Sequence, residues 1–202
     1  EKQDPCYLFN EEGEKLDKLW DGPGGVMTMA QVPGTDGVFL ATRKFYSPND
    51  GIEAEIIVVK PKAEGGWEIY TLCKAPFVHR FGILERGGTV YLLVCCLKSG
   101  YEYKDDWRQK GACYGACLTK DLDQFRGEKK LELKLIKDGM LKNHGFCKMK
   151  RGGYEVGLVG CEEGSFIFDP PAVYGADWTV TKIHSLPSSD SVLVDFDGDG
   201  QL

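Results

Sequence analysis

The sequence repeats one short pattern, and this repeat constrains the fold more than any other feature. Each of the three histidines, His79, His144 and His184, is followed by a short β-rich run, a polar turn and a second, mostly apolar run. A fourth copy begins near Thr28 and lacks the histidine. The intervals between these four positions are 51, 65 and 40 residues. Repeats of roughly 40 to 50 residues are typical of four-stranded propeller blades.

Short β-rich segments separated by glycine, proline, asparagine and aspartate fill most of the chain. Almost no segment has the periodicity of an amphipathic helix. Leu131, Leu133 and Leu135 alternate with Glu132 and Lys134, which is typical of a strand with one solvent-exposed face. We therefore predict an all-β fold, a β-propeller built from four-stranded antiparallel blades. An ordinary β-sandwich is the alternative.

The predicted strands divide the chain into about four blade equivalents. Two strands before Val26 form the outer pair of a shared blade, and an insertion around residues 99–107 explains the longest interval. The ring closes in one of two ways. Either the C-terminal strands complete the first blade, or a longer chain or a second subunit supplies further blades. The predicted units are residues 1–25, 26–76, 77–141, 142–183 and 184–202.

Composition excludes several classes of partner. A net charge of −6 argues against nucleic acid and against an anionic membrane surface. No apolar run approaches the roughly 18 residues of a membrane span. We expect a cytoplasmic protein, unless a signal was removed before residue 1. The eight cysteines are expected to be reduced and mostly buried, because several lie within apolar runs and none has zinc-finger spacing.

The histidines are the main candidates for chemistry. The first strand of each propeller blade lines the central channel, so His79, His144 and His184 are expected to face a common space beside Arg80 and Asn143. Three neutral imidazoles suit a divalent metal, which polarises a carbonyl or lowers the pKa of bound water. A metal with an arginine suits proton abstraction beside a sugar carbonyl. The alternative is that these histidines only cap the blade starts.

An aspartate-rich loop follows the last apolar run, at residues 195–200. Carboxylates at alternate positions before a glycine supply oxygen ligands around a tight turn, as in calcium loops. We expect Asp195, Asp197 and Asp199 to be metal ligands, with calcium in a structural role. The alternative is a solvent-exposed acidic turn.

The insertion around residues 99–107 is a candidate ligand contact. An aromatic face beside carboxylates suits a sugar ring, and loops on a rigid scaffold often carry function. We expect Asp106 and Trp107, together with Asn143, to contact a ligand at the channel mouth. The alternative is an ordered surface loop.

The aspartate loop resembles the FG-GAP/VCBS-type repeats of β-propellers. The segments that begin at Lys142 and His184 are similar to a broader group of bacterial propeller proteins, to which the propeller domain of fungal aldos-2-ulose dehydratase is distantly related. The resemblance implies a propeller of about seven blades, with metal ions and sugar-derived ligands in some members. Thr28 departs from this pattern, because it stands where the other units carry histidine.

Two functions follow as expectations. The first is a metal-assisted lyase, dehydratase or isomerase that acts on a sugar or sugar acid. His79, His144, His184 and Arg80 would be its catalytic residues, and a divalent metal ion in the channel its cofactor. The second is a non-catalytic propeller that binds a ligand or partner, with a calcium ion that only stiffens a loop. In both, the partner is a small molecule such as a carbohydrate.

Overall fold

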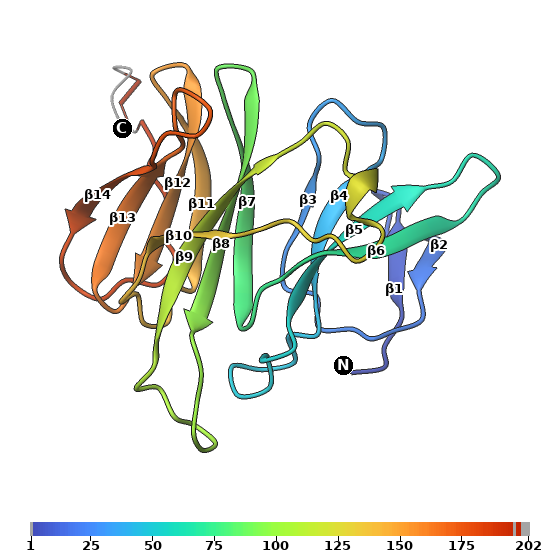
Figure 1. Ribbon diagram of the computed structural model, residues 1–202, viewed down its shortest axis with the longest axis horizontal. Coiled ribbons are helices and arrows are strands. Elements are labelled where there is room, and N and C mark those ends of the chain that lie inside the picture. The colour runs from blue at the N-terminus through green and yellow to red at the C-terminus, as the bar shows by residue number, and fades with distance from the viewer. Residues whose placement is uncertain (1, 196, 199–202) are drawn as a thin grey trace.

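The computed structural model describes residues 2–195 and 197–198, and this part of the chain is all-β. Three four-stranded antiparallel sheets stand side by side, preceded by a two-stranded hairpin (Figure 1). The hairpin consists of β1 (Cys6–Phe9) and β2 (Lys15–Trp20). Sheet I contains β3 (Met29–Gln31), β4 (Phe39–Arg43), β5 (Glu55–Pro61) and β6 (Trp67–Lys74). Sheet II contains β7 (Val78–Arg86), β8 (Thr89–Lys98), β9 (Lys110–Leu118) and β10 (Lys134–Lys137). Sheet III contains β11 (Gly145–Arg151), β12 (Tyr154–Cys161), β13 (Gly164–Asp169) and β14 (Thr179–His184).

Strand order within each sheet follows the chain, so each sheet is a simple meander with its first strand at one edge. The prediction of an all-β chain with four-stranded antiparallel units is confirmed for these three sheets. A short 3-10 turn at Asp123–Phe125 lies between β9 and β10. Within residues 2–195 and 197–198, no helix has the length and apolarity needed to cross a bilayer.

Apolar side chains fill both spaces between the sheets, and β8 contributes to each. Leu92 and Val94 face sheet I, where they join a cluster with Ile56. Leu93 and Cys95 face the other way and pack with residues of sheet III. Because side chains alternate across a strand, a strand that is apolar at every position can be buried on both faces. The run at residues 90–97 therefore makes β8 the central strand of the molecule.

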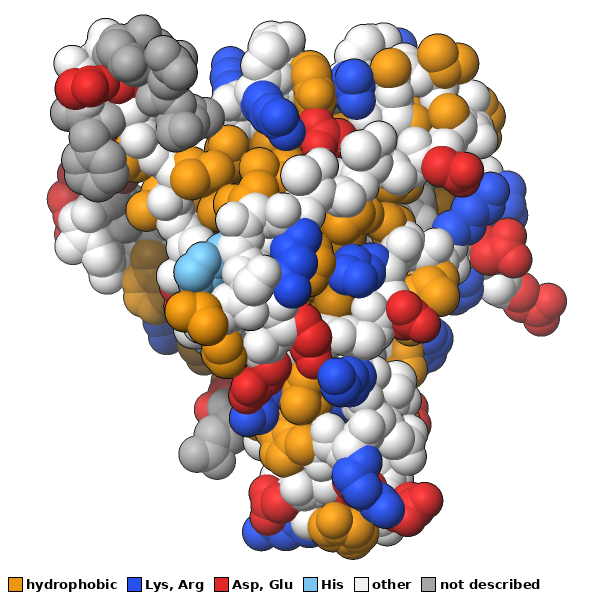
Figure 2. Space-filling view, turned by 90° about the vertical axis from the view of Figure 1, so that its left-hand side faces the viewer, with side chains coloured by type: hydrophobic (Ala, Val, Ile, Leu, Met, Phe, Trp, Pro, Cys, Tyr) orange, Lys and Arg blue, Asp and Glu red, His pale blue; other side chains and the backbone are white. Residues whose placement is uncertain are grey.

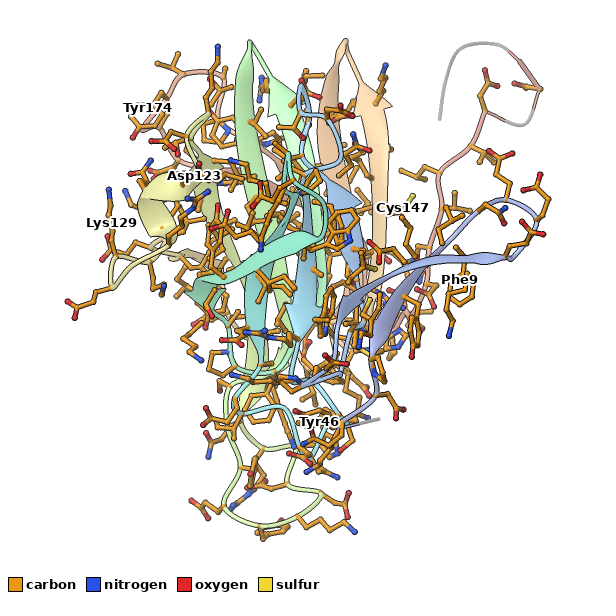
Figure 3. All side chains as sticks on the ribbon, turned by 90° about the vertical axis from the view of Figure 1, so that its right-hand side faces the viewer. Phe9, Tyr46, Asp123, Lys129, Cys147 and Tyr174 are labelled. Atoms are coloured by element: carbon orange, nitrogen blue, oxygen red, sulfur yellow. The ribbon has the colours of Figure 1, made fainter. Side chains whose placement is uncertain are left out.

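The hairpin covers the outer face of sheet I. Leu19 and Trp20 are buried there against Ile57 and Val59. Phe9 is 51% exposed and projects away from the sheets (Figure 3). Among the described residues β1 and β2 pair only with each other, and residues 185–195 form no strand that could join them. The closure predicted between the C-terminal strands and this hairpin is therefore not observed.

The predicted start of a fourth unit at His184 is wrong. His184 is the last residue of β14 and lies opposite Ser165 of β13. β14 is the fourth strand of sheet III. Because His184 ends this sheet and does not begin the next one, the interval of 40 residues before it is shorter than a full repeat. Beyond it, described residues 185–195 form no strand, and the Ser188 N–H donates to the Cys161 carbonyl at 3.0 Å. The chain thus turns back over the end of sheet III.

The far face of sheet III carries a buried cluster that no further sheet of the described chain covers. Val156, Leu158 and Ile167 form a small apolar cluster there, against which Cys147 and Leu193 pack. Figure 2 looks at the molecule from the side of sheet III and shows hydrophobic side chains gathered on its surface.

One buried carboxylate stabilises sheet I. The Glu55 side chain is fully buried, and its oxygens lie 2.7 Å from Arg43, 2.9 Å from Lys44 and 2.7 Å from Lys74. The Thr71 hydroxyl donates a further hydrogen bond at 3.1 Å. Burial alone would raise the pKa of Glu55, but the hydrogen bonds from these cations outweigh it and lower the pKa to about 2.

We predict that Glu55→Gln lowers the free energy of unfolding at pH 7 by about 2–3 kcal/mol. The folded pKa lies below the ordinary value of 4.5. This stabilisation is therefore complete above about pH 5 and is lost as the pH falls towards 2. Denaturant unfolding at several pH values measures both effects. Glu53→Gln, at an exposed position in the same region, is the control. Equal losses in the two variants would contradict the prediction.

Candidate functional site

The candidate site lies where the first strands of the three sheets come together. The Thr28 hydroxyl donates to the carbonyl of His79 at 3.0 Å, and Arg80 Nη1 donates to the Met27 carbonyl at 2.8 Å. On the other side of β7, Gly82 leaves room for Phe146 of β11, because a Cβ at Gly82 would overlap that ring. Segments that are more than 50 residues apart in sequence are thereby joined at one end of the molecule.

Two of the three predicted histidines meet at this end. The rings of His79 and His144 are 4.4 Å apart with an interplanar angle of 33°. His79 is only 4% exposed, and the Phe45 ring packs edge-on against it at 5.2 Å. Both Nδ1 atoms are buried, and neither has a hydrogen-bond partner in the described part of the chain. The predicted convergence thus holds for this pair.

Burial keeps His79 uncharged at neutral pH. Desolvation lowers the pKa of His79 to about 4, and the positive charges of Arg80 and of protonated His144 act in the same direction. Asp190 opposes them. Its carboxylate lies 3.8 Å from His144 Nδ1, which is too far for a hydrogen bond.

His184 is not part of this pair. It is exposed on β14, the fourth strand from the inner edge of sheet III. Three strand spacings separate β14 from β11, which amounts to about 14 Å. Asp190, from the segment that turns back over sheet III, lies beside His144 instead. Among the described residues, no group of three histidine, cysteine or acidic side chains could hold a metal ion. The predicted three-histidine metal site therefore does not fit this arrangement.

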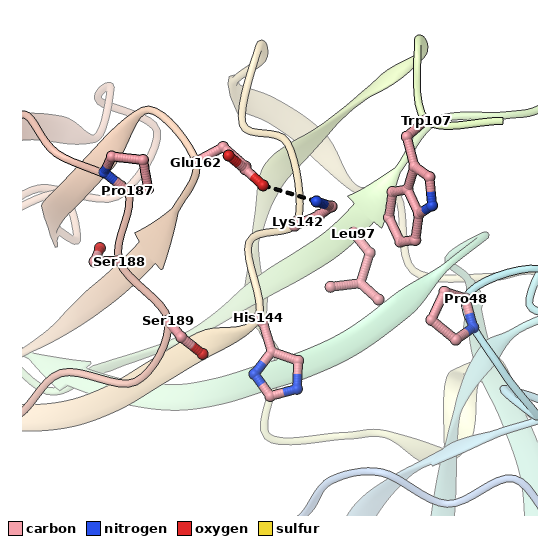
Figure 4. A pocket seen from close by; sticks show the side chains of 9 residues that line it. All are labelled: Pro48, Leu97, Trp107, Lys142, His144, Glu162, Pro187, Ser188 and Ser189. Carbon is pink, nitrogen blue, oxygen red and sulfur yellow. Dashed lines mark hydrogen bonds and ion pairs between the residues drawn. The ribbon is translucent and has the colours of Figure 1, made fainter. Parts of the chain in front are cut away.

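His144 lines a pocket of about 480 Å³, which we call the rim pocket (Figure 4). Trp107, Leu97 and Pro48 stand on one side, and residues 187–189 stand on the other. Lys142 and Glu162 form an ion pair of 2.7 Å across the top of the view. Two residues predicted separately, Trp107 and His144, thus line one cavity.

A buried lysine anchors the loop that carries Trp107. Lys98 ends β8, is fully buried, and donates to Asn49 Oδ1 at 2.9 Å and to the Asp106 carbonyl at 3.2 Å. Its ammonium group lies 4.6 Å from the centre of the Trp107 ring, a cation–π distance. Desolvation lowers the pKa of Lys98 despite the nearby charges of Asp106 and Asp105.

The predicted ligand contacts Asp106 and Asn143 and the predicted catalytic residue Arg80 all make hydrogen bonds within the protein. The Asp106 carboxylate is buried and accepts hydrogen bonds from Arg108 Nε at 2.8 Å and from the Glu102 N–H at 3.0 Å. These bonds, above all those from Arg108, hold the pKa of Asp106 well below its usual range. Asn143 is buried, and its Nδ2 donates to the Ala112 carbonyl at 3.1 Å. Arg80 is engaged with the Met27 carbonyl.

The predicted calcium loop is only partly described. Asp195 Oδ1 accepts a hydrogen bond from the Gly198 N–H at 2.7 Å, which closes a tight turn. Asp197 is described, whereas Asp199 lies outside the described residues. The calcium site remains a prediction.

Sequence reasoning missed several residues of the rim pocket. It also missed Lys98, which holds the loop beside the pocket, although a lone lysine directly after the apolar run at residues 90–97 is a signal of a buried cation. Glu162 lines the pocket from the turn between β12 and β13. Ser188 and Ser189 line it because their segment crosses the end of sheet III. No periodicity in the sequence predicts that crossing.

No protein-family model and no curated protein matches this chain. The site is therefore interpreted from its own geometry.

We predict that His79 stays neutral down to about pH 4 in the folded protein. Its folded pKa is about 4, below the ordinary 6.5. Protonation therefore favours the unfolded chain, and His79 lowers the stability progressively as the pH falls from about 6.5 to 4. An NMR titration of the imidazole protons measures the pKa directly. His79→Phe keeps a ring in the stack and should flatten the stability profile over this range. His184→Phe, at an exposed strand end, is the control, and titration of His79 near pH 6.5 would refute the prediction.

We predict that Lys98→Met loosens the loop at residues 99–109. The substitution keeps an apolar stem but removes the donor to Asn49 and Asp106, so hydrogen exchange in the loop should rise by roughly tenfold. Hydrogen–deuterium exchange with mass spectrometry measures this. Lys104→Met, at an exposed position within the same loop, should leave the exchange unchanged. An unchanged loop in Lys98→Met would show that the ammonium group does not anchor it.

Proposed function

We propose that the chain is part of a β-propeller and serves as a binding module whose rim pocket takes a carbohydrate. Three features support the propeller. The sheets are four-stranded meanders, they pack face to face, and their first strands lie next to each other. These are the properties of propeller blades, in which the first strands surround a central channel.

The far face of sheet III supports a larger assembly, because no further sheet packs on it within the described part of the chain. Sheets I and II have both faces covered, by the hairpin or by a neighbouring sheet. Val156, Leu158 and Ile167 have only Leu193 and other partly buried neighbours against them. We propose that a further blade, from a longer chain or from a second subunit, packs on this face, because Val192 and Val194 beside Leu193 are 66% and 41% exposed and exposed apolar side chains are typical of a packing surface.

The lining of the rim pocket carries the functional proposal. Trp107 presents an aromatic ring, and Ser188 and Ser189 line the opposite wall. The Ser188 hydroxyl is hydrogen-bonded to the Ser165 hydroxyl at 2.7 Å, and Ser189 presents a second hydroxyl group. A sugar ring has an apolar face that stacks on an aromatic side chain and hydroxyl groups that exchange hydrogen bonds with polar side chains. Lys142 and Glu162 neutralise each other, so the pocket favours a neutral sugar over a sugar acid.

A metal-assisted lyase, dehydratase or isomerase is the second candidate. The paired imidazoles favour it, because both Nδ1 atoms lack a partner among the described residues. The missing third ligand weighs against it, and so does the engagement of Arg80 with a backbone carbonyl. Binding without catalysis is therefore the better-supported proposal.

We predict that Trp107→Leu weakens carbohydrate binding at least tenfold, about 1.4 kcal/mol. Isothermal titration calorimetry with methyl glucoside, methyl galactoside, methyl mannoside and glucuronate measures the affinity. Trp67→Leu is the matched control, because Trp67 lies on β6 against the hairpin. If none of these sugars binds, or if both variants lose affinity equally, the proposal fails.

The same samples distinguish a metal-assisted enzyme from a binding module. Conversion of glucuronate that appears on addition of a divalent metal and disappears in His144→Ala would favour the lyase over the binding module. Binding of a neutral glycoside without conversion favours the module.

A further inference from the structure

A second pocket lies at the opposite end of sheet II, and we call it the outer pocket. It measures about 600 Å³ and is formed by β9, β10, the loop before β10 and the segment that leads into β14. Lys129 and Tyr174, which both line it, lie on the same side of the molecule (Figure 3). Tyr91 lines the outer pocket and Leu97 the rim pocket. These residues are six positions apart on β8, which is about 20 Å, and the two pockets share no lining residue.

One wall of the outer pocket is aromatic. The rings of Tyr91 and Trp178 are 5.8 Å apart and nearly perpendicular, at 77°. Gly115 on β9 allows Trp178 to approach the strand, since a Cβ there would lie 2.7 Å from the indole Nε1. Ile136 and Phe125 add apolar surface. A planar ring can pack against such a wall.

A buried hydroxyl group in this wall lacks a partner. Tyr91 is 3% exposed, and its oxygen makes no hydrogen bond to any described residue. A buried polar atom without a partner costs about 1–3 kcal/mol, and native structures rarely leave one unexplained. A bound molecule that exchanges a hydrogen bond with Tyr91 would remove this cost.

Three lysines and two carboxylates, those of Glu132 and Asp177, line the pocket, so its lining carries one positive charge in excess. Lys129 donates to Gln124 Oε1 at 2.5 Å, and Lys130 donates to the carbonyls of Phe125 and Gly127 at 3.1 and 2.6 Å. Lys134 on β10 also lines the pocket, and no ion pair or hydrogen bond holds its ammonium group within the described chain. An anionic group on a ligand could pair with Lys134.

We propose that the outer pocket binds a planar aromatic compound that carries one anionic group, such as an aryl carboxylate. Its ring packs against Trp178 and Tyr91, and its carboxylate pairs with Lys134. The Tyr91 hydroxyl group hydrogen-bonds to the bound molecule. This site is independent of the carbohydrate proposed for the rim pocket.

The test uses 2-naphthoate and its neutral counterpart 2-naphthamide. Each of the four tryptophans gives its own indole N–H signal in a nitrogen–proton NMR spectrum. We expect 2-naphthoate to shift the signal of Trp178 and to leave that of Trp107 in place. The amide should bind roughly tenfold more weakly, because it cannot pair with Lys134.

Two variants make the proposal falsifiable. Lys134→Gln should weaken 2-naphthoate binding by roughly tenfold. Tyr91→Phe should weaken it severalfold while leaving the thermal midpoint unchanged or raised, because the hydroxyl group has no partner to lose. Lys150→Gln, at an exposed position on β11, is the control. The proposal is overturned if Trp178 does not respond to 2-naphthoate, if acid and amide bind equally, or if Lys134→Gln binds like the control.

Discussion

The structure depends on β8, a strand that is buried on both faces. Its residues Leu92 and Val94 pack towards sheet I, while Leu93 and Cys95 pack towards sheet III. Two sheets can stack on the same partner only if the shared strand is apolar at every position. Cysteine serves here as a small hydrophobic residue, and burial raises the pKa of the Cys96 thiol well above its ordinary range. The packing of the sheets therefore explains why thiols are tolerated in this run and why burial makes them unreactive.

The end of the same strand positions the rim pocket. Lys98 brings a positive charge into the interior directly after the apolar run. A buried cation must be compensated, and the compensation comes from Asn49, from the Asp106 carbonyl and from the Trp107 ring. The last two belong to the inserted loop, so compensation of this charge also fixes the position of the tryptophan. The pocket thus follows from the core rather than from an independent feature of the loop.

The sequence predicts those parts of the structure that depend on periodicity. The all-β class, the four-stranded units and the meeting of His79 with His144 all follow from a repeat that the fold preserves. His184 does not follow the repeat, because it belongs to the outer strand β14 and pairs there with β13. Asp190 takes a place beside His144 from a segment without strand structure, which no repeat can locate.

Polar residues were harder to interpret, because their roles depend on which hydrogen bonds are available nearby. Asp106 carries a carboxylate beside an aromatic ring, as a sugar-binding residue would. In the folded chain Arg108 and backbone N–H groups satisfy that carboxylate instead. Of the three residues predicted to contact a ligand, Asp106, Trp107 and Asn143, Trp107 alone lines the rim pocket.

The charge balance around the histidine pair then determines the kind of ligand that suits this end of the molecule. A neutral His79 avoids placing a second cation beside Arg80, and its low pKa shows that burial and this neighbour both favour the uncharged ring. Lys142 is already paired with Glu162, and Asp190 lies beside His144. Among the residues that line the rim pocket, Lys142 is the one lysine or arginine, and Glu162 pairs with it. The neutral sugar that we propose for the rim pocket needs only the ring of Trp107 and the hydroxyl groups opposite it.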